Sequence, residues 1–407
     1  MSQEWFVRRG EIERGPLSSK ELRHLVVSGS VEEFDWVRRI DSKEWKRAGS
    51  LSGLFLFPNS EATSSSYQLQ ARLSGHRGMV GCVAFAPDGQ MLASGGFDTT
   101  IRLWDVVSLK QSAMLVGHTD VVSGVKFSPN GKELATCSWD GTIRIWSNNA
   151  ENERLVIRGH RKEVQHIAYH PTGYWLVSSS ADDTIRCWNV QDGREIACLA
   201  IRHPTVVSFS NDGRLMASSQ MGFRGSIALY RCEIADDPEV EFDDGRRFRL
   251  VQIDSLWAMN ALGNAFSPDG KTIAAAFNKG KTYLGNDEFG LSPSDDEVGG
   301  WVVLWPVSDQ QSRSIGDKAN SQENVWKAHT DGGNSVSFSP DGRFVASTGK
   351  DGLVTVWDQL KCYSFPIELR GHRGGTVDAV FSPDGMFIAS AGADSDIFVW
   401  DIQDEYA

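Results

Sequence analysis

From residue 69 onward, apolar and polar positions repeat in one fixed order. An apolar run ending in Phe follows a Gly-His pair, and a Pro-Asp-Gly turn separates it from a second run ending in small residues. A segment containing Asp leads to a third run, such as TIRIW at 142–146, which ends in Trp. Short runs of this kind, bounded by turn residues, predict β-strands. The scarcity of polar positions in TIRIW indicates strands covered on both sides.

The Gly-His pairs set the period of this repeat. His76, His118 and His160 are 42 residues apart, and His329 and His372 are 43 apart. A period in the forties with strand signals is typical of four-stranded propeller blades. Pro fixes φ at the second position of six of the turns and Gly takes the left-handed conformation at the fourth, which predicts hairpins. The turn occurs seven times, as APDG at 86–89, SPNG at 128–131, HPTG at 170–173, SNDG at 210–213 and SPDG at 267–270, 339–342 and 382–385.

The repeats resemble those of the WD-repeat family over residues 69–407. Trp-Asp itself stands at 104-105, 357-358 and 400-401, with variants at 146-147, 188-189, 230-231 and 305-306. The resemblance implies a mainly β chain whose principal domain is a closed seven-bladed β-propeller. It also implies that the strand at about 69–74 completes the last blade, because closure removes the exposed sheet edges.

Each complete repeat carries one His, one hydroxyl, one Asp and one Trp that the fold is expected to bring together. Their polar groups can satisfy one another in a buried chain of hydrogen bonds. Because the set recurs with the period, we interpret it as structural rather than as a Ser-His-Asp catalytic triad. The five complete sets are His76, Ser94, Asp98, Trp104; His118, Thr136, Asp140, Trp146; His160, Ser178, Asp182, Trp188; His329, Ser347, Asp351, Trp357; and His372, Ser390, Asp394, Trp400.

Two repeats depart from this pattern. The fourth retains only His203 and Ser218, with Tyr230 in place of Trp, and the fifth keeps little beyond Trp305. These two blades are expected to be the least stable.

Residues 1–56 lack the period and predict a small α+β domain. SKELRHLVVSG, at 19–29, favours a short helix capped by Ser18 or Ser19 before it and by Gly29 at its end. The segment resembles the bacterial branch of the GYF domain, an adaptor that binds proline-rich peptides. The matching positions are Gly15-Pro16, Gly29, Trp5, Trp36 and Trp45.

The binding surface of that family is less well matched than its scaffold. Leu25 stands where the peptide-binding members have Trp, and Ser30-Val31 stand where they have Tyr-Phe. Trp5, Phe6 and Trp36 therefore either form a groove for a peptide or fill a small core. Residues 57–68 are polar and rich in Ser, which predicts a flexible linker to the second domain at 69–407.

Charge and cysteine content narrow the partners and the compartment. The net charge of −12 argues against nucleic acid or an anionic membrane as a partner, because both attract basic surfaces. The first ten residues carry charges where a signal peptide would be apolar, and no segment is apolar enough to span a bilayer. Six Cys without a CxxC pair indicate core residues in a reducing compartment. We expect a cytoplasmic monomer without a cofactor.

The Gly-His segments and the Asp turns should share one rim of the ring, which the family resemblance implies is the usual partner-binding face. Aromatic and Arg side chains there suit a binding surface. The alternative is that Phe97 and Trp139 lie on neighbouring loops while the basic side chains are solvated. The candidate residues are Arg77, Phe97, Asp120, Trp139, Arg161, Lys162, Lys350 and Arg373.

Two insertions interrupt the period. Residues 278–300 replace the Asp turn of the fifth repeat and should project from the same rim, whereas 232–247 should lie on the opposite rim or the outer edge.

The acidic groups of the 278–300 insertion have no regular calcium-binding spacing, and His160, Glu163 and His166 do not match the zinc-binding motif HExxH. We therefore predict a non-enzymatic scaffold without a bound metal. The alternative is a hydrolase-like or metal-binding propeller that uses the 278–300 loop.

Removal of residues 69–75 should prevent closure of the ring. The exposed edge of the last sheet is then expected to cause aggregation or rapid proteolysis. Light scattering and limited proteolysis test this, and a truncated protein that melts like the intact one would contradict it.

Overall fold

The computed structural model describes residues 4–9, 12–18, 22, 36–40, 45–47, 68–147, 153–222, 226–234, 248–257, 260–279, 299–307, 325–359 and 366–402. The chain divides into two compact units, and the second begins at Ser66. The predicted linker lies outside the described residues except for Gln68. No helix in the described part is long and apolar enough to cross a membrane.

The first unit contains one antiparallel sheet. Val7 and Val37 are buried on one of its faces. The predicted helix at 19–29 lies outside the described residues except for Leu22, which is buried, and Ser18 belongs to a strand. The sheet order is β2 (Ile12–Ser18), β1 (Glu4–Arg9), β3 (Trp36–Arg39) and β4 (Lys46–Arg47).

The second unit contains, in its described part, seven four-stranded sheets, which we call blades. The expectation of a mainly β chain built from repeated four-stranded sheets is confirmed. The first four blades consist of β6 (Val80–Phe85), β7 (Met91–Gly96), β8 (Ile101–Asp105), β9 (Lys110–Leu115); β10 (Val122–Phe127), β11 (Glu133–Ser138), β12 (Thr142–Ser147), β13 (Glu153–Arg158); β14 (Val164–Tyr169), β15 (Trp175–Ser180), β16 (Thr184–Asn189), β17 (Glu195–Ala200); and β18 (Pro204–Phe209), β19 (Leu215–Gln220), β20 (Ser226–Ile234), β21 (Phe248–Trp257).

The last blade differs from the others in taking its outermost strand from the start of the unit. That strand, β5, pairs antiparallel with β32, and Leu73 lies opposite Ile397. The fifth to seventh blades consist of β22 (Ala261–Phe266), β23 (Thr272–Lys279), β24 (Gly299–Pro306), β25 (Val325–His329); β26 (Gly333–Phe338), β27 (Phe344–Gly349), β28 (Leu353–Asp358), β29 (Ile367–Arg370); and β30 (Thr376–Phe381), β31 (Phe387–Gly392), β32 (Asp396–Asp401), β5 (Gln68–Ser74).

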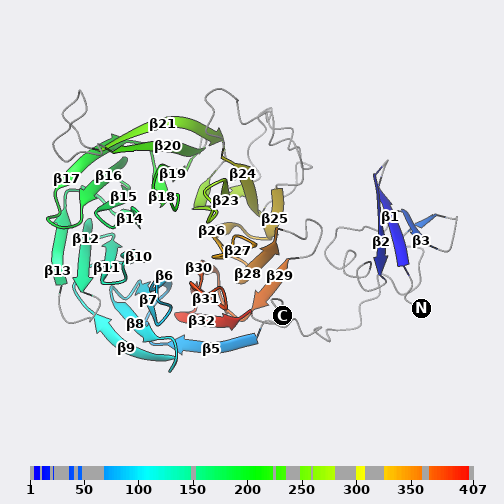
Figure 1. Ribbon diagram of the computed structural model, residues 1–407. Coiled ribbons are helices and arrows are strands. Elements are labelled where there is room, and N and C mark those ends of the chain that lie inside the picture. The colour runs from blue at the N-terminus through cyan, green and yellow to red at the C-terminus, as the bar shows by residue number, and fades with distance from the viewer. Residues whose placement is uncertain are drawn as a thin grey trace. The chain divides into compact units, whose positions relative to one another are not determined.

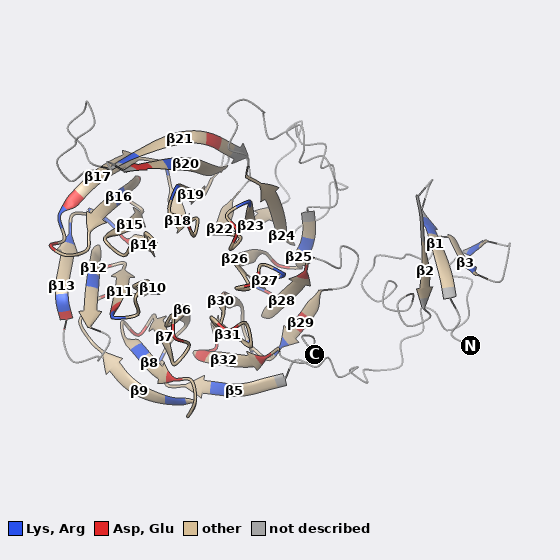
Figure 2. Ribbon diagram, viewed as in Figure 1, with Lys and Arg blue, Asp and Glu red and all other residues tan. Residues whose placement is uncertain are grey.

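The blades stand around a common centre, as in a β-propeller (Figure 1). The first strand of each blade packs beside the first strand of the next, and β30 packs beside β6, so these contacts form a closed ring. The core lies between the blades. Trp104 of the first blade, for example, packs with Ala389 and Val399 of the seventh. Among the described residues, charged side chains occur on outer strands and in turns (Figure 2), and also on innermost strands, as with Lys126 of β10 and Asp378 of β30.

The predicted hairpin turns are present between the first and second strands of every blade. Their seven glycines have φ values between 68° and 77°, in the left-handed region that Gly adopts without strain. In the first blade the N–H of Gly89 donates to the carbonyl of Ala86 at 2.9 Å. The Pro-Asp-Gly signal therefore marks one end of each blade.

The cysteines of the described residues are free thiols. Cys82, Cys137, Cys187 and Cys232 are buried in the blades, and Cys198 is exposed. Burial raises the pKa of Cys137 and of Cys232 to about 12, so both thiols are protonated at neutral pH.

An ion pair reinforces the strand that closes the ring. Arg72 Nε of β5 donates to Asp396 Oδ2 at 2.8 Å, and Ser74 Oγ donates to Asp396 Oδ1 at 2.6 Å. The Asp396 side chain is only 4% exposed. In the first three blades the equivalent position is Thr100, Thr142 or Thr184. The seventh blade thus has a carboxylate where the first three blades have a hydroxyl, and this carboxylate holds the first strand of the unit to the last.

Asp396→Asn should destabilise the closed ring by about 1–3 kcal/mol, because the amide presents a donor to the Arg72 guanidinium. Urea unfolding measures this difference. Glu368→Gln is the matched control, since Glu368 and Arg370 form an exposed ion pair, and its effect should stay within about 0.5 kcal/mol. Equal effects of the two substitutions would contradict a specific role for Asp396.

Candidate functional site

The loops with the Gly-His pairs and the Asp turns lie at the same end of the blades. The former join the fourth strand of one blade to the first strand of the next, and the latter join the second strand to the third. We call this end the GH rim and the end with the Pro-Asp-Gly turns the opposite rim. A Cβ placed on Gly141 would lie 3.4 Å from the carbonyl oxygen of Lys162, so neighbouring loops of the GH rim touch.

A chain of hydrogen bonds runs from the interior of the second blade to this rim. Trp146 Nε1 donates to Thr136 Oγ1 at 2.9 Å, and Thr136 Oγ1 lies 2.8 Å from His118 Nε2. His118 Nδ1 lies 2.8 Å from Asp140 Oδ2. One tautomer satisfies every member, with His118 donating from Nδ1 and accepting on Nε2.

Three other blades contain the same chain with distances of 2.7–3.0 Å. The first blade joins Trp104, Ser94, His76 and Asp98. The third joins Trp188, Ser178, His160 and Asp182, and the seventh joins Trp400, Ser390, His372 and Asp394.

The sixth blade lacks the last link of this chain. His329 lies 3.0 Å from both Ser347 and Asp351, but among the described residues the indole N–H of Trp357 has no hydrogen-bond partner. Trp357 instead stacks on Trp326, with ring centroids 5.0 Å apart and planes 7° apart. The expected set is therefore incomplete here.

Trp326 offers a physical reason for this departure. It stands three residues before His329, where four other repeats have Leu or Ile. An indole at this position gives Trp357 a large flat partner in place of a small aliphatic one. Sequence analysis missed this effect, although the substitution is visible in the repeat. The aliphatic equivalents are Leu73, Leu115, Ile157 and Leu369.

The fourth and fifth blades do not form the chain. His203 is exposed and pairs with Asp183 at 3.3 Å rather than pointing toward Ser218. Tyr230 is buried, which raises its pKa to about 12. In the fifth blade Trp301 occupies the position of Thr100, and among the described residues its indole N–H has no hydrogen-bond partner.

Burial and hydrogen bonding fix the protonation of the set in the first blade. Burial alone would raise the pKa of Asp98, but donors from Arg77, His76 and Thr100 outweigh it and lower the pKa to about 2. Burial lowers the pKa of His76 although its bond to Asp98 opposes the shift. The carboxylate is therefore charged at neutral pH and the imidazole is neutral. The pKa values of Asp140, Asp182, Asp351 and Asp394 are lowered in the same way.

The hydroxyls of the sets are inaccessible to a substrate. Ser94, Thr136, Ser178, Ser347 and Ser390 are each 0% exposed. A nucleophile must reach the substrate, so these groups are unsuited to acyl transfer. His166 lies on β14, where burial lowers its pKa to about 3. No cluster of three or more metal-ligating side chains occurs among the residues that the structure describes.

The carboxylates connect the buried chain to the GH rim. Asp98 Oδ2 accepts the main-chain N–H of Arg77 at 2.9 Å, and Asp182 Oδ2 accepts that of Arg161 at 3.0 Å. Asp394 Oδ2 accepts the N–H of Arg373 at 2.9 Å. The residue after each of these histidines is thus held by its main chain while its side chain is exposed.

The structure brings two of the candidate rim residues into contact. The rings of Phe97 and Trp139 meet edge to face with centroids 5.5 Å apart, and Trp139 is 38% exposed. The main-chain N–H groups of these residues donate to Met79 and Val121, which fixes both turns. The basic and acidic candidates are exposed, and these are Arg77, Asp120, Arg161, Lys162, Lys350 and Arg373.

Each insertion connects two strands at the rim where the sequence places it. The 278–300 segment connects β23, which ends at Lys279, with β24, which begins at Gly299, at the GH rim. The 232–247 segment connects β20 with β21 at the opposite rim. Residues 280–298 and 235–247 lie outside the described residues.

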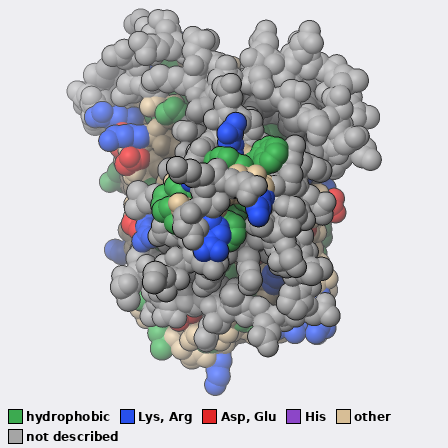
Figure 3. Space-filling model, turned by 90° about the vertical axis from the view of Figure 1, so that its right-hand side faces the viewer, with side chains coloured by type: hydrophobic (Ala, Val, Ile, Leu, Met, Phe, Trp, Pro, Cys, Tyr) green, Lys and Arg blue, Asp and Glu red, His purple; other side chains and the backbone are tan. Residues whose placement is uncertain are grey.

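The aromatic residues of the first unit do not share one face. In the pairing of β1 with β3, Phe6 lies opposite Arg38 and Arg8 lies opposite Trp36. Trp5, the residue before Phe6, lies opposite Arg39. Since side chains alternate along a strand, Phe6 and Trp36 lie on one face and Trp5 lies on the other. The Arg38 guanidinium lies 4.6 Å from the ring centre of Phe6 and 5.1 Å from that of Trp45. Basic and hydrophobic side chains also adjoin among the described residues drawn in Figure 3.

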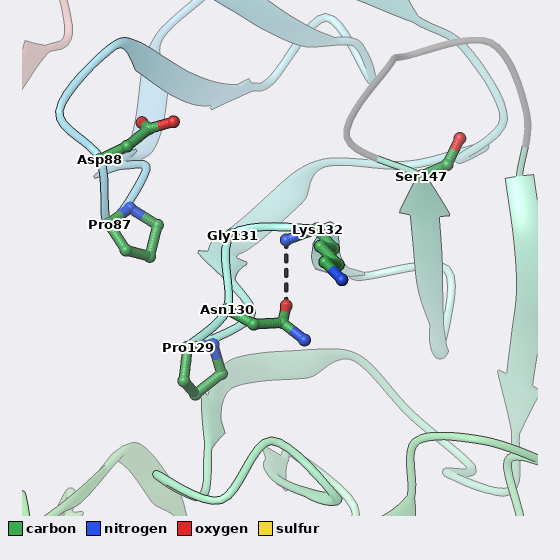
Figure 4. A pocket seen from close by; sticks show the side chains of 7 residues that line it. All are labelled: Pro87, Asp88, Pro129, Asn130, Gly131, Lys132 and Ser147. Carbon is green, nitrogen blue, oxygen red and sulfur yellow. Dashed lines mark hydrogen bonds between the residues drawn. The ribbon is translucent and has the colours of Figure 1, made fainter.

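An open cavity of about 710 Å³ lies on the opposite rim between the first two blades (Figure 4). It forms where one hairpin turn packs beside the next, with Pro87 3.5 Å from a Cβ placed on Gly131. The N–H of Lys132 donates to Asn130 Oδ1 at 3.0 Å, which holds the turn. None of the candidate rim residues lines this cavity. Its lining consists of Pro87, Asp88, Pro129, Asn130, Gly131, Lys132 and Ser147.

Comparison with known proteins finds the same repeats. Five segments, 67–105, 109–147, 152–189, 320–358 and 363–401, match the family described as WD domain, G-beta repeat. The family match does not include residues 190–319, which contain the divergent fourth blade and the first three strands of the fifth.

Similar curated proteins share only short stretches with this chain. Periodic tryptophan protein 2 homolog from Neurospora crassa is 48% identical over 46 residues, 11% of this chain and 5% of that protein. Ribosome assembly protein 4 from Chaetomium thermophilum is 35% identical over 74 residues, 18% of this chain and 14% of that protein. Small ribosomal subunit protein RACK1z from Arabidopsis thaliana is 45% identical over 47 residues, 12% and 14% of the two chains.

Asp140→Ala should destabilise the protein by about 1–3 kcal/mol, because it removes the carboxylate that bonds Nδ1 of the buried His118. Thermal unfolding at pH 7 measures the loss. The folded-state pKa of Asp140 is lowered, so its contribution is complete above about pH 4 and decreases at lower pH. The difference between the two proteins should therefore shrink below that pH. Asp120→Ala, in an exposed position of the same rim, is the control, and equal melting of both variants would contradict the structural role.

Proposed function

We propose that this chain, five segments of which match the WD domain, G-beta repeat family, is a WD-repeat protein and a non-enzymatic scaffold. Its seven-bladed propeller would bind partner proteins on the GH rim. The seven four-stranded sheets of the described residues and the contact of β30 with β6 support the blade count and the closure. The relatives named for ribosome assembly and for the small ribosomal subunit support a scaffold role in general. The stretches that these relatives share with this chain are too short to indicate which partner it binds.

One observation carries the proposal, namely the contrast between buried and exposed side chains at the GH rim. The His, hydroxyl and Asp groups that could do chemistry are engaged with one another inside the blades. What reaches solvent is an aromatic pair with exposed basic side chains. Trp and Arg are enriched among residues that dominate binding energies at protein interfaces. The rim is therefore suited to recognition rather than to catalysis.

The first unit is proposed to be a GYF-like adaptor, covering residues 1–56, that binds a peptide. Its binding face would be the one with Phe6 and Trp36, since Trp5 lies on the other face. Two modest binding sites joined by the short 57–68 linker would raise the effective concentration of one partner near the other. This cytoplasmic monomer would then hold two proteins at once, without nucleic acid, membrane or cofactor.

Affinity capture from the native host with the full chain tests the proposal. We expect a set of proteins that is recovered with the wild type and lost with Trp139→Ala, because that substitution removes the exposed half of the aromatic pair. Tyr174→Ala is the matched control, since Tyr174 is an aromatic residue on the opposite rim that is 71% exposed. Identical protein sets for all three chains would argue against the GH rim as the binding surface.

A further inference from the structure

Three arginines occupy one equivalent position of the repeat around the GH rim. Arg373, Arg77 and Arg161 each follow the rim histidine, in the seventh, first and third blades. Each main-chain N–H is held at 2.9–3.0 Å by the carboxylate of its blade. The main chain that carries each arginine is therefore held in place, which reduces the conformational entropy lost when a partner orders the side chain.

The aromatic pair lies between two of these arginines along the rim. Phe97 follows β7, and its N–H bonds to Met79, two residues after Arg77. On the other side, the turn of Trp139 continues to Gly141, which adjoins Lys162 next to Arg161. The order along the rim is therefore Arg77, Phe97, Trp139 and then Arg161 with Lys162. We call these five residues and Arg373 the basic arc.

Exposed charge within the arc is mainly positive. Arg373, Arg77, Arg161 and Lys162 are exposed. Outside the buried sets, the acidic residues of these and the adjoining loops are Asp120, which is exposed, Glu163, which is half-buried, and Asp183, whose side chain is 48% exposed and pairs with His203. Asp120 also accepts the N–H of Val121 at 2.7 Å. The carboxylates of the buried sets are at most 9% exposed and bonded to N–H donors. This local excess of cations contrasts with the net charge of −12 for the whole chain.

We propose, building on the scaffold function above, that the basic arc binds an acidic linear segment of a partner protein. One large apolar side chain of that segment would rest on Phe97 and Trp139. Carboxylates before and after it would face Arg77 on one side and Arg161 with Lys162 on the other.

The chemistry of the arc favours this occupant over a basic or purely apolar one. Guanidinium groups donate two parallel hydrogen bonds to a carboxylate, which fixes its orientation as well as its position. The exposed part of Trp139 supplies an apolar surface for the anchor. Opposite charges on the two partners also accelerate their encounter, and salt weakens that effect.

Selection of a random 16-residue peptide display library on the full chain tests the proposal. We expect the selected peptides to be enriched in Asp and Glu on both sides of a Trp, Phe or Leu. Fluorescence anisotropy of the selected peptides should show affinity losses of about tenfold or more for Trp139→Ala and for Arg161→Glu. Arg214→Glu is the matched control, because Arg214 is an exposed arginine of the opposite rim, and it should change the affinity less than twofold. Arg77→Glu provides a second charge reversal, and circular dichroism melting verifies folding of each variant.

The contrary outcomes separate this proposal from the scaffold function. One contrary outcome is that the selected peptides lack acidic enrichment and lose affinity equally for Arg161→Glu and Arg214→Glu, yet still depend on Trp139. That result would overturn the proposal of an acidic segment and keep the GH rim as a binding surface. An absence of any peptide dependent on Trp139 would count against both. A single-stranded 16-mer of uridine that binds through Arg161 more tightly than the peptides would overturn the acidic segment in favour of nucleic acid.

Discussion

The pairing of β5 with β32 is the constraint on which the second unit depends. It joins residues 324 apart in the sequence, as the contact of Arg72 with Asp396 illustrates. A ring closed in this way has no unpaired edge between its last and first blades, and each blade is covered by two neighbours. Its core is accordingly divided among the blade interfaces. The substitution of Asp396 for a hydroxyl residue is specific to the blade in which the two ends of the ring meet.

The same fold explains why apparently catalytic residues serve a structural role here. His118, Thr136 and Asp140 lie at distances that a hydrolase could use, yet the hydroxyl is buried and shared with Trp146. Burial removes the groups from substrates and makes each hydrogen bond necessary for stability. Asp140 Oδ2, which bonds His118, also accepts the main-chain N–H of Thr119 at the rim. The network that stabilises the blade therefore also positions the residues proposed to bind partners.

The blades are not equivalent, and those with a complete hydrogen-bond network are neighbours in the ring. Complete networks occur in the first, second, third and seventh blades, which also carry the basic arc. The sixth has lost one link to the stacking of Trp326 on Trp357, and the fourth and fifth have lost the set. The long insertion at the GH rim belongs to the fifth blade. The sector proposed to bind partners thus adjoins a more divergent one.

The sequence by itself determined the repeated units, their hairpin turns and the membership of four complete networks. These depend on short-range signals, such as Gly at a left-handed position or a fixed spacing between His118 and Asp140. The sequence did not determine contacts between side chains that lie on different strands or loops, because the spacing of residues along the chain does not specify them. The tertiary structure alone decided that Arg72 meets Asp396, that the ring of Phe97 touches that of Trp139, and that His203 faces solvent. It also placed Trp36 on the same face as Phe6, because only strand pairing decides which residues of two strands share a face of the sheet.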